Sequence, residues 1–523
     1  MLGRAAATAM MAALWIGCWC GGCRAYRILA YEPSVGHSHW NVMSAVLESL
    51  VDAGHVVVCA TVHPATGRLA GHPNYTHVDM AAGVPEHAHR TARDLDYAQL
   101  MSLFRSNAFL VRSVTDLTRR MCRLLFEMPG TRRYLVGGGR AGRFDAVVVE
   151  SLHSECGAAL PRALRVPAVY VVPCPPVSWM PAATGSPDSP SYLGALLADR
   201  PTPVTFRDRL ANALVYVHTQ LVRRYHDAGS WVHDTAVLSP SASTGAVVLI
   251  NTHHSIEPAR SAGPNVVDIG GIHLRPAGPI PRDLAQVLDD SDEFGVIVFS
   301  FGSLVALNSL PEDILDKLKS VFRQLPQTII WKYENDHMPD KPDNVVLYKW
   351  LPQRAILQHP NVKVFISHGG LNGVYEAVDG GVPILGIPLF FDQPRNIQNL
   401  VDLGMALSLK INEFTEATLY EAINRLIEDQ KYCKLMNFSE NAKRVSTLFK
   451  DRPMSPSDSA VYWIEYLIRH GSEANVTPPS ADASWTVHFM VDQLFVALSV
   501  LALALWCSVR VFRYRTSIGI PGK

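Results

Sequence analysis

The chain has 523 residues, of which 48% are hydrophobic and 18% are charged, so it is too long for one ordinary core and too hydrophobic to be disordered. The 47 basic and 47 acidic residues give a formal net charge of +0. Because binding to a phosphate backbone needs a clustered excess of Lys and Arg, nucleic acid is not an expected partner.

Residues 1–25 predict a signal peptide. They contain an early cation, Arg4, then an apolar run, then small residues with Cys23 and Ala25 at the spacing of a cleavage site. A buried first helix is the alternative. The Gly21-Gly22 break and the strand-like YRILAY that follows do not favour it.

Near the other end, residues 489–509 form an apolar run long enough to cross a hydrocarbon core, followed by Arg510, Arg513 and Arg515. This pattern predicts a transmembrane helix over 488–509 with a cytosolic tail over 510–523, which is a single-pass type I anchor. A core helix is the weaker alternative. The body of the chain is then expected on the luminal side of the endoplasmic reticulum membrane.

A luminal location has consequences for asparagines and cysteines. The sequons at Asn74, Asn437 and Asn475 are expected to carry glycans. The cysteines between the two end segments form an odd set, which is not a disulfide framework. These are Cys59, Cys122, Cys156, Cys174 and Cys433.

Two parts of the chain repeat an order of short apolar strand, polar turn and helix. The first begins with YRILAY and the second with FGVIVFSFGS. Fully apolar strands that alternate with helices imply parallel sheets covered on both faces, so we expect two doubly wound α/β domains, over 26–265 and 266–450. The Pro- and Gly-rich segment 263–281 is the expected crossing. Residues 451–487 are expected to form a returning helix and a stalk.

Residues 350–401 are the most informative segment. In VKVFISHGGLNGVYEA a strand ends at Ser367, two glycines including Gly370 permit a tight turn, and a helix begins near Asn372. A helix N-terminus at the carboxyl end of a parallel strand suits a pyrophosphate. His368 and the side chain of Asn372 can add donors, and Glu376 lies one turn later, where it can accept from ribose hydroxyls.

Four further polar or aromatic side chains follow strands in this segment. Trp350 and Gln353 are placed in a loop after a short strand, where an indole can stack on a base and an amide can bind its edge. Asp392 and Gln393 follow PLFF at another strand end, and an acid with an amide is a common pair for holding sugar hydroxyls.

This arrangement closely resembles the signature of the UDP-glycosyltransferases, inverting transferases that include vertebrate glucuronosyltransferases and insect glucosyltransferases. The resemblance covers essentially the whole chain and is nearest to insect members. It implies two facing Rossmann-like domains of the GT-B type, with the UDP-sugar on the C-terminal domain and a small lipophilic acceptor on the N-terminal one. It also implies a role in detoxification, and homo-oligomers are compatible with it.

The resemblance assigns roles to individual residues. Trp350 would stack on uracil and Gln353 bind it, and Glu376 would take the ribose. The diphosphate would lie against His368, Gly370 and Asn372, with Ser303 of the FSFGS stretch near the phosphates. The donor sugar would be held by Asp392 and Gln393.

A base is needed because the acceptor hydroxyl must lose a proton as it attacks. His39, placed in the loop after the first strand within the triplet SHW, resembles the family's catalytic histidine; His37 is a lower-ranked competitor. Glu150 is expected to orient it from a strand end, where many family members carry Asp. Glu155 is the fallback.

No group of residues has metal-ligand spacing, so we expect no metal and no cofactor beyond the UDP-sugar co-substrate. Three points stay open. A non-catalytic UDP-sugar-binding membrane protein is the alternative from another class, and a Rossmann oxidoreductase lacks an early dinucleotide fingerprint. The donor sugar is expected to be glucose, although Arg260 or another cation could meet a glucuronate carboxylate.

Overall fold

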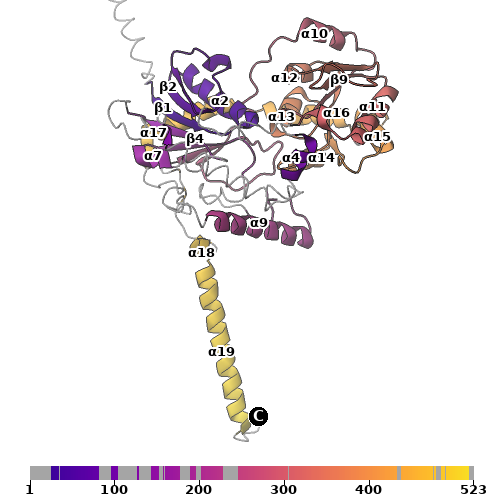
Figure 1. Cartoon of the computed structure of the whole chain (residues 1–523). Coiled ribbons are helices and arrows are strands. Elements are labelled where there is room, and N and C mark those ends of the chain that lie inside the picture. Colours follow the sequence, from indigo (N-terminus) through magenta and orange to yellow (C-terminus); the bar gives the residue numbers. More distant parts are fainter. Residues whose placement is uncertain are drawn as a thin grey trace, which may run out of the picture.

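The computed structural model is described for residues 25–34, 36–81, 96–103, 127–128, 143–151, 157, 159–176, 189–195, 202–227, 246–303, 305–432, 437–474, 476, 478, 485–488 and 490–517. Figure 1 shows a body of two α/β units and one long helix that projects from it. The predicted signal peptide, Glu155, Asn475 and three of the cysteines, Cys122, Cys156 and Cys433, lie outside the described residues.

The N-terminal domain is built on a parallel sheet in the order β3-β2-β1-β4-β5-β6-β7. Its five central strands are buried because valine, isoleucine and leucine recur on both faces, whereas the edge strands β3 and β7 are partly exposed. They are β1 (Arg27–Glu32), β2 (Val56–Thr61), β3 (Tyr75–Asp79), β4 (Ala146–Glu150), β5 (Ala168–Val172), β6 (Ala246–Ile250) and β7 (Val266–Asp268). Its described α-helices are α2 (His37–Asp52), α7 (Ala159–Leu164) and α9 (Phe206–Asp227), whereas α4 (Tyr97–Leu103) follows β3 in the chain but packs against the C-terminal domain.

The C-terminal domain has a second parallel sheet, in the order β10-β9-β8-β11-β12-β13. Its strands are β8 (Val296–Ser300), β9 (Thr328–Lys332), β10 (Val345–Tyr348), β11 (Val362–Ser367), β12 (Ile384–Gly386) and β13 (Ala406–Ser408). Its helices are α10 (Arg282–Asp289), α11 (Glu312–Gln324), α12 (Gln353–Leu357), α13 (Leu371–Gly380), α14 (Gln393–Asp402), α15 (Glu416–Tyr432) and α16 (Phe438–Lys450). The predicted fold class, two doubly wound parallel sheets, is confirmed.

The predicted domain boundary at residue 265 is displaced. Strand β7 pairs in parallel with β6, so the first sheet runs to Asp268, and Leu284 of α10 already packs in the core of the C-terminal domain. Helix α17 (Pro456–His470) then returns to the N-terminal domain, where Ile464 and Leu467 join the core beside α2. The crossing therefore lies between β7 and α10, and the chain crosses back before α17.

The long helix that projects from the body is α19 (Val491–Ser517). It has 27 residues, and an 18-residue stretch of it has a mean hydropathy of 2.2 and no buried part, so its length and composition allow it to cross a membrane. It begins after the short α18 (Trp485–His488) and extends beyond the predicted end at residue 509, through the basic cluster. The predicted tail is therefore helical as far as Ser517.

Two predicted glycosylation sites and two of the five cysteines between the end segments fall on described residues. Asn74 lies in the turn before β3, and Asn437 caps α16 by accepting a hydrogen bond from the Glu440 backbone N–H at 3.1 Å. This cap uses the side-chain oxygen of Asn437, and the amide nitrogen takes no part in it. Cys59 and Cys174 are both buried free thiols.

Candidate active site

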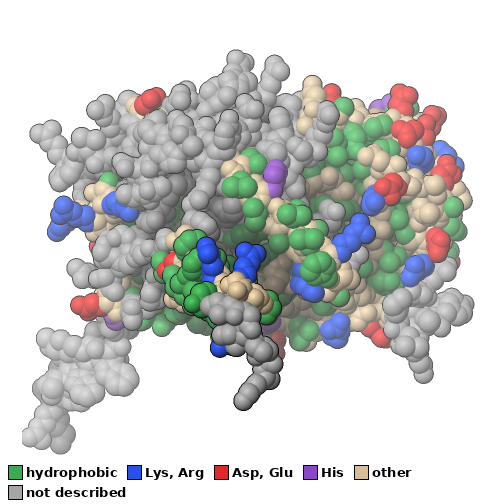
Figure 2. Space-filling view, turned by 90° about the horizontal axis from the view of Figure 1, so that it is seen from below, with side chains coloured by type: hydrophobic (Ala, Val, Ile, Leu, Met, Phe, Trp, Pro, Cys, Tyr) green, Lys and Arg blue, Asp and Glu red, His purple; other side chains and the backbone are tan. Residues whose placement is uncertain are grey.

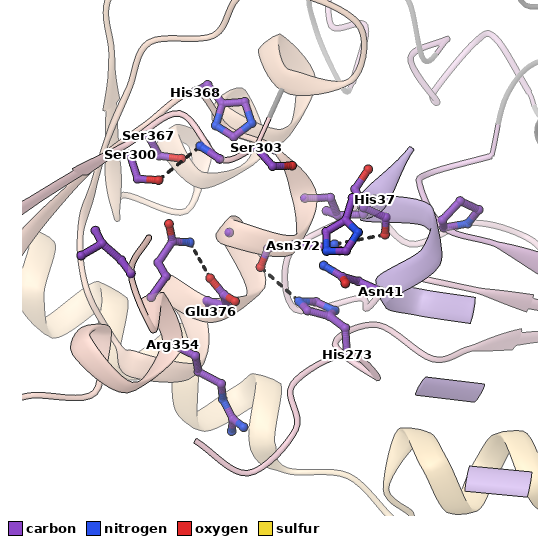
Figure 3. Close-up of a pocket in the computed structure, with 18 of the residues that line it drawn as sticks. His37, Asn41, His273, Ser300, Ser303, Arg354, Ser367, His368, Asn372 and Glu376 are labelled. Atoms are coloured by element: carbon purple, nitrogen blue, oxygen red, sulfur yellow. Dashed lines mark hydrogen bonds between the residues drawn. The ribbon is translucent and has the colours of Figure 1, made fainter. Parts of the chain in front are cut away.

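The two domains enclose a cavity of about 680 Å³. Its walls come from both domains and from the crossing between them, and Figure 3 shows labelled residues around it that come from several elements. Each predicted donor-site residue lines this cavity, as does His39. The donor-site residues are Ser303, Trp350, Gln353, His368, Gly370, Asn372, Glu376, Asp392 and Gln393.

The predicted diphosphate turn lies where β8 and β11 end side by side. Ser300 and Ser367 are register partners, and each accepts a hydrogen bond on Oγ from a glycine N–H two residues later, at 3.2 Å. Helix α13 starts at Leu371, one residue before the predicted start, and has no side-chain cap. Its first N–H groups therefore face the cavity and can bind an anion.

Glycines pack this turn around the ring of His368. A Cβ on Gly302 would lie 2.9 Å from His368 Cε1, and one on Gly370 would lie 2.5 Å from Nε2. Gly369, at φ +83°, leaves no room either, because its Cβ would lie 2.5 Å from Ile397 Cγ1. The glycines are thus needed both for the backbone conformation and for the close approach of His368.

Burial, and then the positive charge of Lys332, lower the pKa of His368 to about 4. The imidazole is therefore neutral at neutral pH and can act as a hydrogen-bond donor, not as a cation. Lys332, at the end of β9, supplies the positive charge on this side of the cavity, where its Nζ lies 2.7 Å from Glu334 Oε1.

The residues predicted to bind the uracil and the ribose lie close together, and two of them are hydrogen-bonded to each other. Trp350 is 66% exposed in the loop after β10. Gln353 is not in that loop but is the first residue of α12, and its Nε2 donates to Glu376 Oε2 at 2.5 Å. Burial raises the pKa of Glu376 to about 7, and the hydrogen bond from Gln353 opposes this rise. Ribose hydroxyls would therefore share Glu376 with Gln353.

The acid and amide predicted to hold the sugar are buried at the start of α14, several residues after β12 ends. Gln393 uses its Oε1 to accept from the backbone N–H groups of Leu389 and Phe390, at 2.9 and 3.2 Å, which leaves its amide nitrogen to donate. Burial raises the pKa of Asp392 to about 6; hydrogen bonding to Asn396 opposes the rise, and the charge of His39 also acts on it.

His39 faces this pair from the N-terminal domain. The sequence predicted a loop at this position, but His39 lies in the first turn of α2, because the helix already begins at His37. Its Nδ1 lies 3.4 Å from Oε1 of Glu150, which is buried at the end of β4 as predicted. The distance suits an ion pair at Nδ1. The other ring nitrogen, Nε2, takes no part in this pair. His37 also lines the cavity.

A second carboxylate lies next to Glu150. The β1–β4 register places Tyr31 opposite Val149, so Glu32 and Glu150 end adjacent strands, and both are fully buried. Burial, and then the charge of Glu150, raise the pKa of Glu32 well above its ordinary value. The raised pKa of Glu32 favours its protonated form over a second buried carboxylate beside Glu150.

Contacts across the cavity join the domains. Asn372 Nδ2 donates to the Ser38 carbonyl at 3.2 Å, and His273 Nε2 lies 3.2 Å from the Asn372 carbonyl. Asn372 thus uses one of its two amide N–H groups on the other domain, and the second N–H can still donate to a phosphate. Arg395 is a further link, because it pairs with Glu257 at 3.0 Å and donates to a backbone carbonyl of the segment 189–195.

Sequence reasoning missed part of the wall and placed one candidate outside it. Residues 273 and 275–278 of the crossing line the cavity, and the position of this segment between two domains was the available signal. Arg260, considered for a glucuronate carboxylate, is not among the lining residues. Helix α4, although it follows β3 in the chain, packs in the core of the C-terminal domain, where the Tyr97 N–H donates to Ser309 Oγ at 3.0 Å.

Comparisons with known proteins agree with this geometry. The family model of UDP-glucoronosyl and UDP-glucosyl transferase matches residues 29–523. UDP-glucosyltransferase 2 of Dactylopius coccus is 31% identical over 89% of this chain and 88% of its own length, and rat (Rattus norvegicus) UDP-glucuronosyltransferase 2B1 is 28% identical over 89% of each. The solved glycotransferase of kitacinnamycin has the same fold, with a TM-score of 0.58 and 18% identity over 85% of this chain and 99% of that one. The chain therefore belongs to the UDP-glucoronosyl and UDP-glucosyl transferase family and is a glycosyltransferase that uses a UDP-sugar.

Proposed function

We propose that the protein transfers glucose from UDP-glucose to a hydroxyl of a small lipophilic acceptor, with inversion at the anomeric carbon. The observation that carries the proposal is that His39 lines the cavity and acts electrostatically on Asp392, while its Nδ1 lies 3.4 Å from Oε1 of the buried Glu150. A base and a sugar-binding pair therefore meet in one cavity, with the orienting carboxylate next to the base.

In the proposed reaction, Nε2 of His39 takes the proton of the acceptor hydroxyl. The hydroxyl oxygen forms a bond to the anomeric carbon as the bond from that carbon to the diphosphate oxygen breaks, and UDP leaves. Glu150 stabilises the imidazolium from Nδ1. The Glu in place of the family's usual Asp reaches His39 and keeps the charge, which supports catalysis over a binding role alone.

The charge of the leaving UDP would be met by the N-terminus of α13 and by His368. These groups make a metal ion unnecessary in the proposed reaction. EDTA should leave turnover unchanged, and loss of activity that Mg²⁺ or Mn²⁺ restores would contradict this part of the proposal.

Glucose is favoured over glucuronate by the charges around the cavity. The Arg and Lys side chains among its described lining residues are each paired with a carboxylate: Arg275 with Glu48, Lys332 with Glu334 and Arg354 with Asp379. A glucuronate carboxylate would meet no available cation there and would lie near Asp392. Apolar wall residues, Pro173, Cys174, Phe390 and Phe391, suit a lipophilic acceptor.

The experiment is a competition between UDP-glucose and UDP-glucuronate over a panel of phenols and steroids, with products identified by mass. We expect hexoside products, with the opposite anomeric configuration to the donor. Predominant glucuronides would overturn the choice of donor, and retained configuration would overturn the inverting mechanism. Binding of UDP-glucose without any product would remove the proposed catalytic role of His39.

We further propose that α19 anchors the protein in the endoplasmic reticulum membrane with both domains in the lumen. The mean hydropathy of 2.2 over its 18-residue stretch and the basic residues at its C-terminal end support this orientation. Protease treatment of sealed microsomes should spare both domains and remove only a short tail.

A further inference from the structure

Helix α9 has its apolar side chains on the outside. Phe206, Leu210, Leu214, Val217 and Leu221 recur every three or four residues and so share one narrow face, and each is between 51% and 73% exposed. An amphipathic helix of a globular protein normally turns this face toward the core. Among the described helices of the body, α9 carries such a row of exposed large apolar side chains.

The opposite face of α9 is polar and buried. Asn212 is 4% exposed; its Nδ2 donates to the carbonyls of Pro190 and Leu193 at 2.7 and 2.8 Å, and its Oδ1 accepts from the Ala195 N–H at 2.8 Å. Thr219, on the same face, is 1% exposed. The protein therefore holds α9 by its polar side, and these hydrogen bonds fix the apolar side outward.

The position of α9 indicates what covers the apolar side. Figure 1 shows α9 lying crosswise to α19, at the level where α19 leaves the body next to α18. Figure 2, seen from below, shows hydrophobic side chains gathered on the face of the body from which α19 projects. A membrane crossed by α19 would therefore run along the exposed face of α9.

Basic residues border the apolar row. Arg207 and Arg209 are both exposed in the first turn of α9, and Arg209 donates to the Val204 carbonyl at 2.9 Å. Apolar residues facing outward with arginines at their edge are the composition of a helix that lies in the interface of a bilayer with anionic lipid. A soluble protein partner would not need the helix to be level with the anchor.

We propose that α9 is a second membrane contact, a helix that lies in the lipid headgroup region with Phe206, Leu210, Leu214, Val217 and Leu221 facing the acyl chains. This inference rests on the proposed anchor, because α19 sets the level of the membrane. It would fix the two domains against the bilayer instead of leaving them free on a stalk. It would also bring the N-terminal domain next to the phase in which a lipophilic acceptor dissolves.

The test places a photoreactive benzophenone amino acid at Leu214 of the full chain in vesicles of phosphatidylcholine and phosphatidylserine. Matched variants carry it at Leu501 of α19, to report the anchor, and at Leu448 of α16, an exposed leucine of the C-terminal domain. After illumination we expect lipid adducts at Leu214 and Leu501, and none at Leu448. UDP binding by each variant verifies that it is folded.

The outcomes separate the two proposals. Lipid adducts at Leu501 without any at Leu214 would overturn the contact of α9 and leave the anchor. Adducts at Leu214 alone would support α9 and overturn the anchor, and adducts at neither position would overturn both. A protein–protein adduct at Leu214, such as one with a second copy of the chain, would also overturn the lipid contact.

A second variant tests the apolar row itself. Leu210→Glu together with Val217→Glu, combined with the label at Leu214, should abolish the lipid adduct at that position. The adduct at Leu501 should persist in the same background. Because both substituted side chains are exposed, the fold should tolerate them; an undiminished lipid adduct at Leu214 would contradict the proposal.

Discussion

The side chain of Asn372 in the C-terminal domain donates from Nδ2 to the backbone carbonyl of Ser38 in the N-terminal domain, at 3.2 Å. Ser38 immediately precedes His39, and Asn372 lies in the first turn of the helix proposed to bind the diphosphate. The hydrogen bond thus joins the proposed base to the proposed donor site.

Asn372→Ala should lower kcat as well as donor affinity, because the N-terminus of α2 loses its hydrogen bond to α13. One net hydrogen bond is worth about 1 kcal/mol, so a fall of about fivefold is expected. Steady-state kinetics with UDP-glucose would measure it, with Asn308→Ala, an exposed asparagine of the same domain, as the control. A change in donor KM alone would contradict the positional role.

His39→Ala should reduce turnover by about 10²–10⁴-fold, the usual contribution of a general base, while leaving UDP affinity close to that of the parent protein. His37→Ala is the matched control on the same turn, and its turnover should fall far less. If His37→Ala were the more damaging change, the assignment of the base would have to move to His37.

Glu150→Gln should lower kcat more than Glu150→Asp. Gln removes the charge that stabilises the imidazolium, whereas Asp keeps the charge and only lengthens the distance from the present 3.4 Å. The diagnostic measurement is kcat of both variants beside that of the parent protein, with UDP affinity verifying that the donor site is intact. Equal kcat for Glu150→Gln and Glu150→Asp would contradict the dyad.

Gly369→Ala should destabilise the C-terminal domain and weaken donor binding. The residue has φ +83°, and the new Cβ would lie 2.5 Å from Ile397 Cγ1. The left-handed backbone alone costs roughly 1–2 kcal/mol for a non-glycine residue. Urea unfolding would measure the loss. Gly278→Ala is the control, because its Cβ meets nothing within 4 Å.

Donor affinity should rise with pH up to the region of the Glu376 pKa, about 7, and then level off. Burial raises this pKa, so at lower pH the carboxyl is protonated and no longer accepts from ribose hydroxyls as a carboxylate. In the limit, affinity falls about tenfold per pH unit below the pKa.

Calorimetric titration of UDP-glucose at several pH values would test the titration of Glu376. Asp392, with a pKa of about 6, also titrates in this range, so the difference between the parent protein and Glu376→Gln isolates Glu376. Identical pH dependence in the two proteins would refute its role.

The sequence by itself determined the local elements and the residue types at their ends. The apolar runs of β8 and β11 and the glycines after them predict strand, turn and helix, because these depend on neighbouring residues and on backbone conformation. The long apolar run of α19 could be predicted from the sequence for the same reason, since its length and hydropathy are local properties.

The tertiary structure decided which of these elements meet. His39 and Glu150 come from different segments, and only the adjacency of β1 and β4 brings them to 3.4 Å and places Glu32 beside them. Likewise, β7 joined the first sheet by strand pairing, and α9 turned its apolar row outward because Asn212 bonds to the segment 189–195. Pairing partners, burial and the direction of a helix face arise from contacts distant in the chain, which periodicity does not encode.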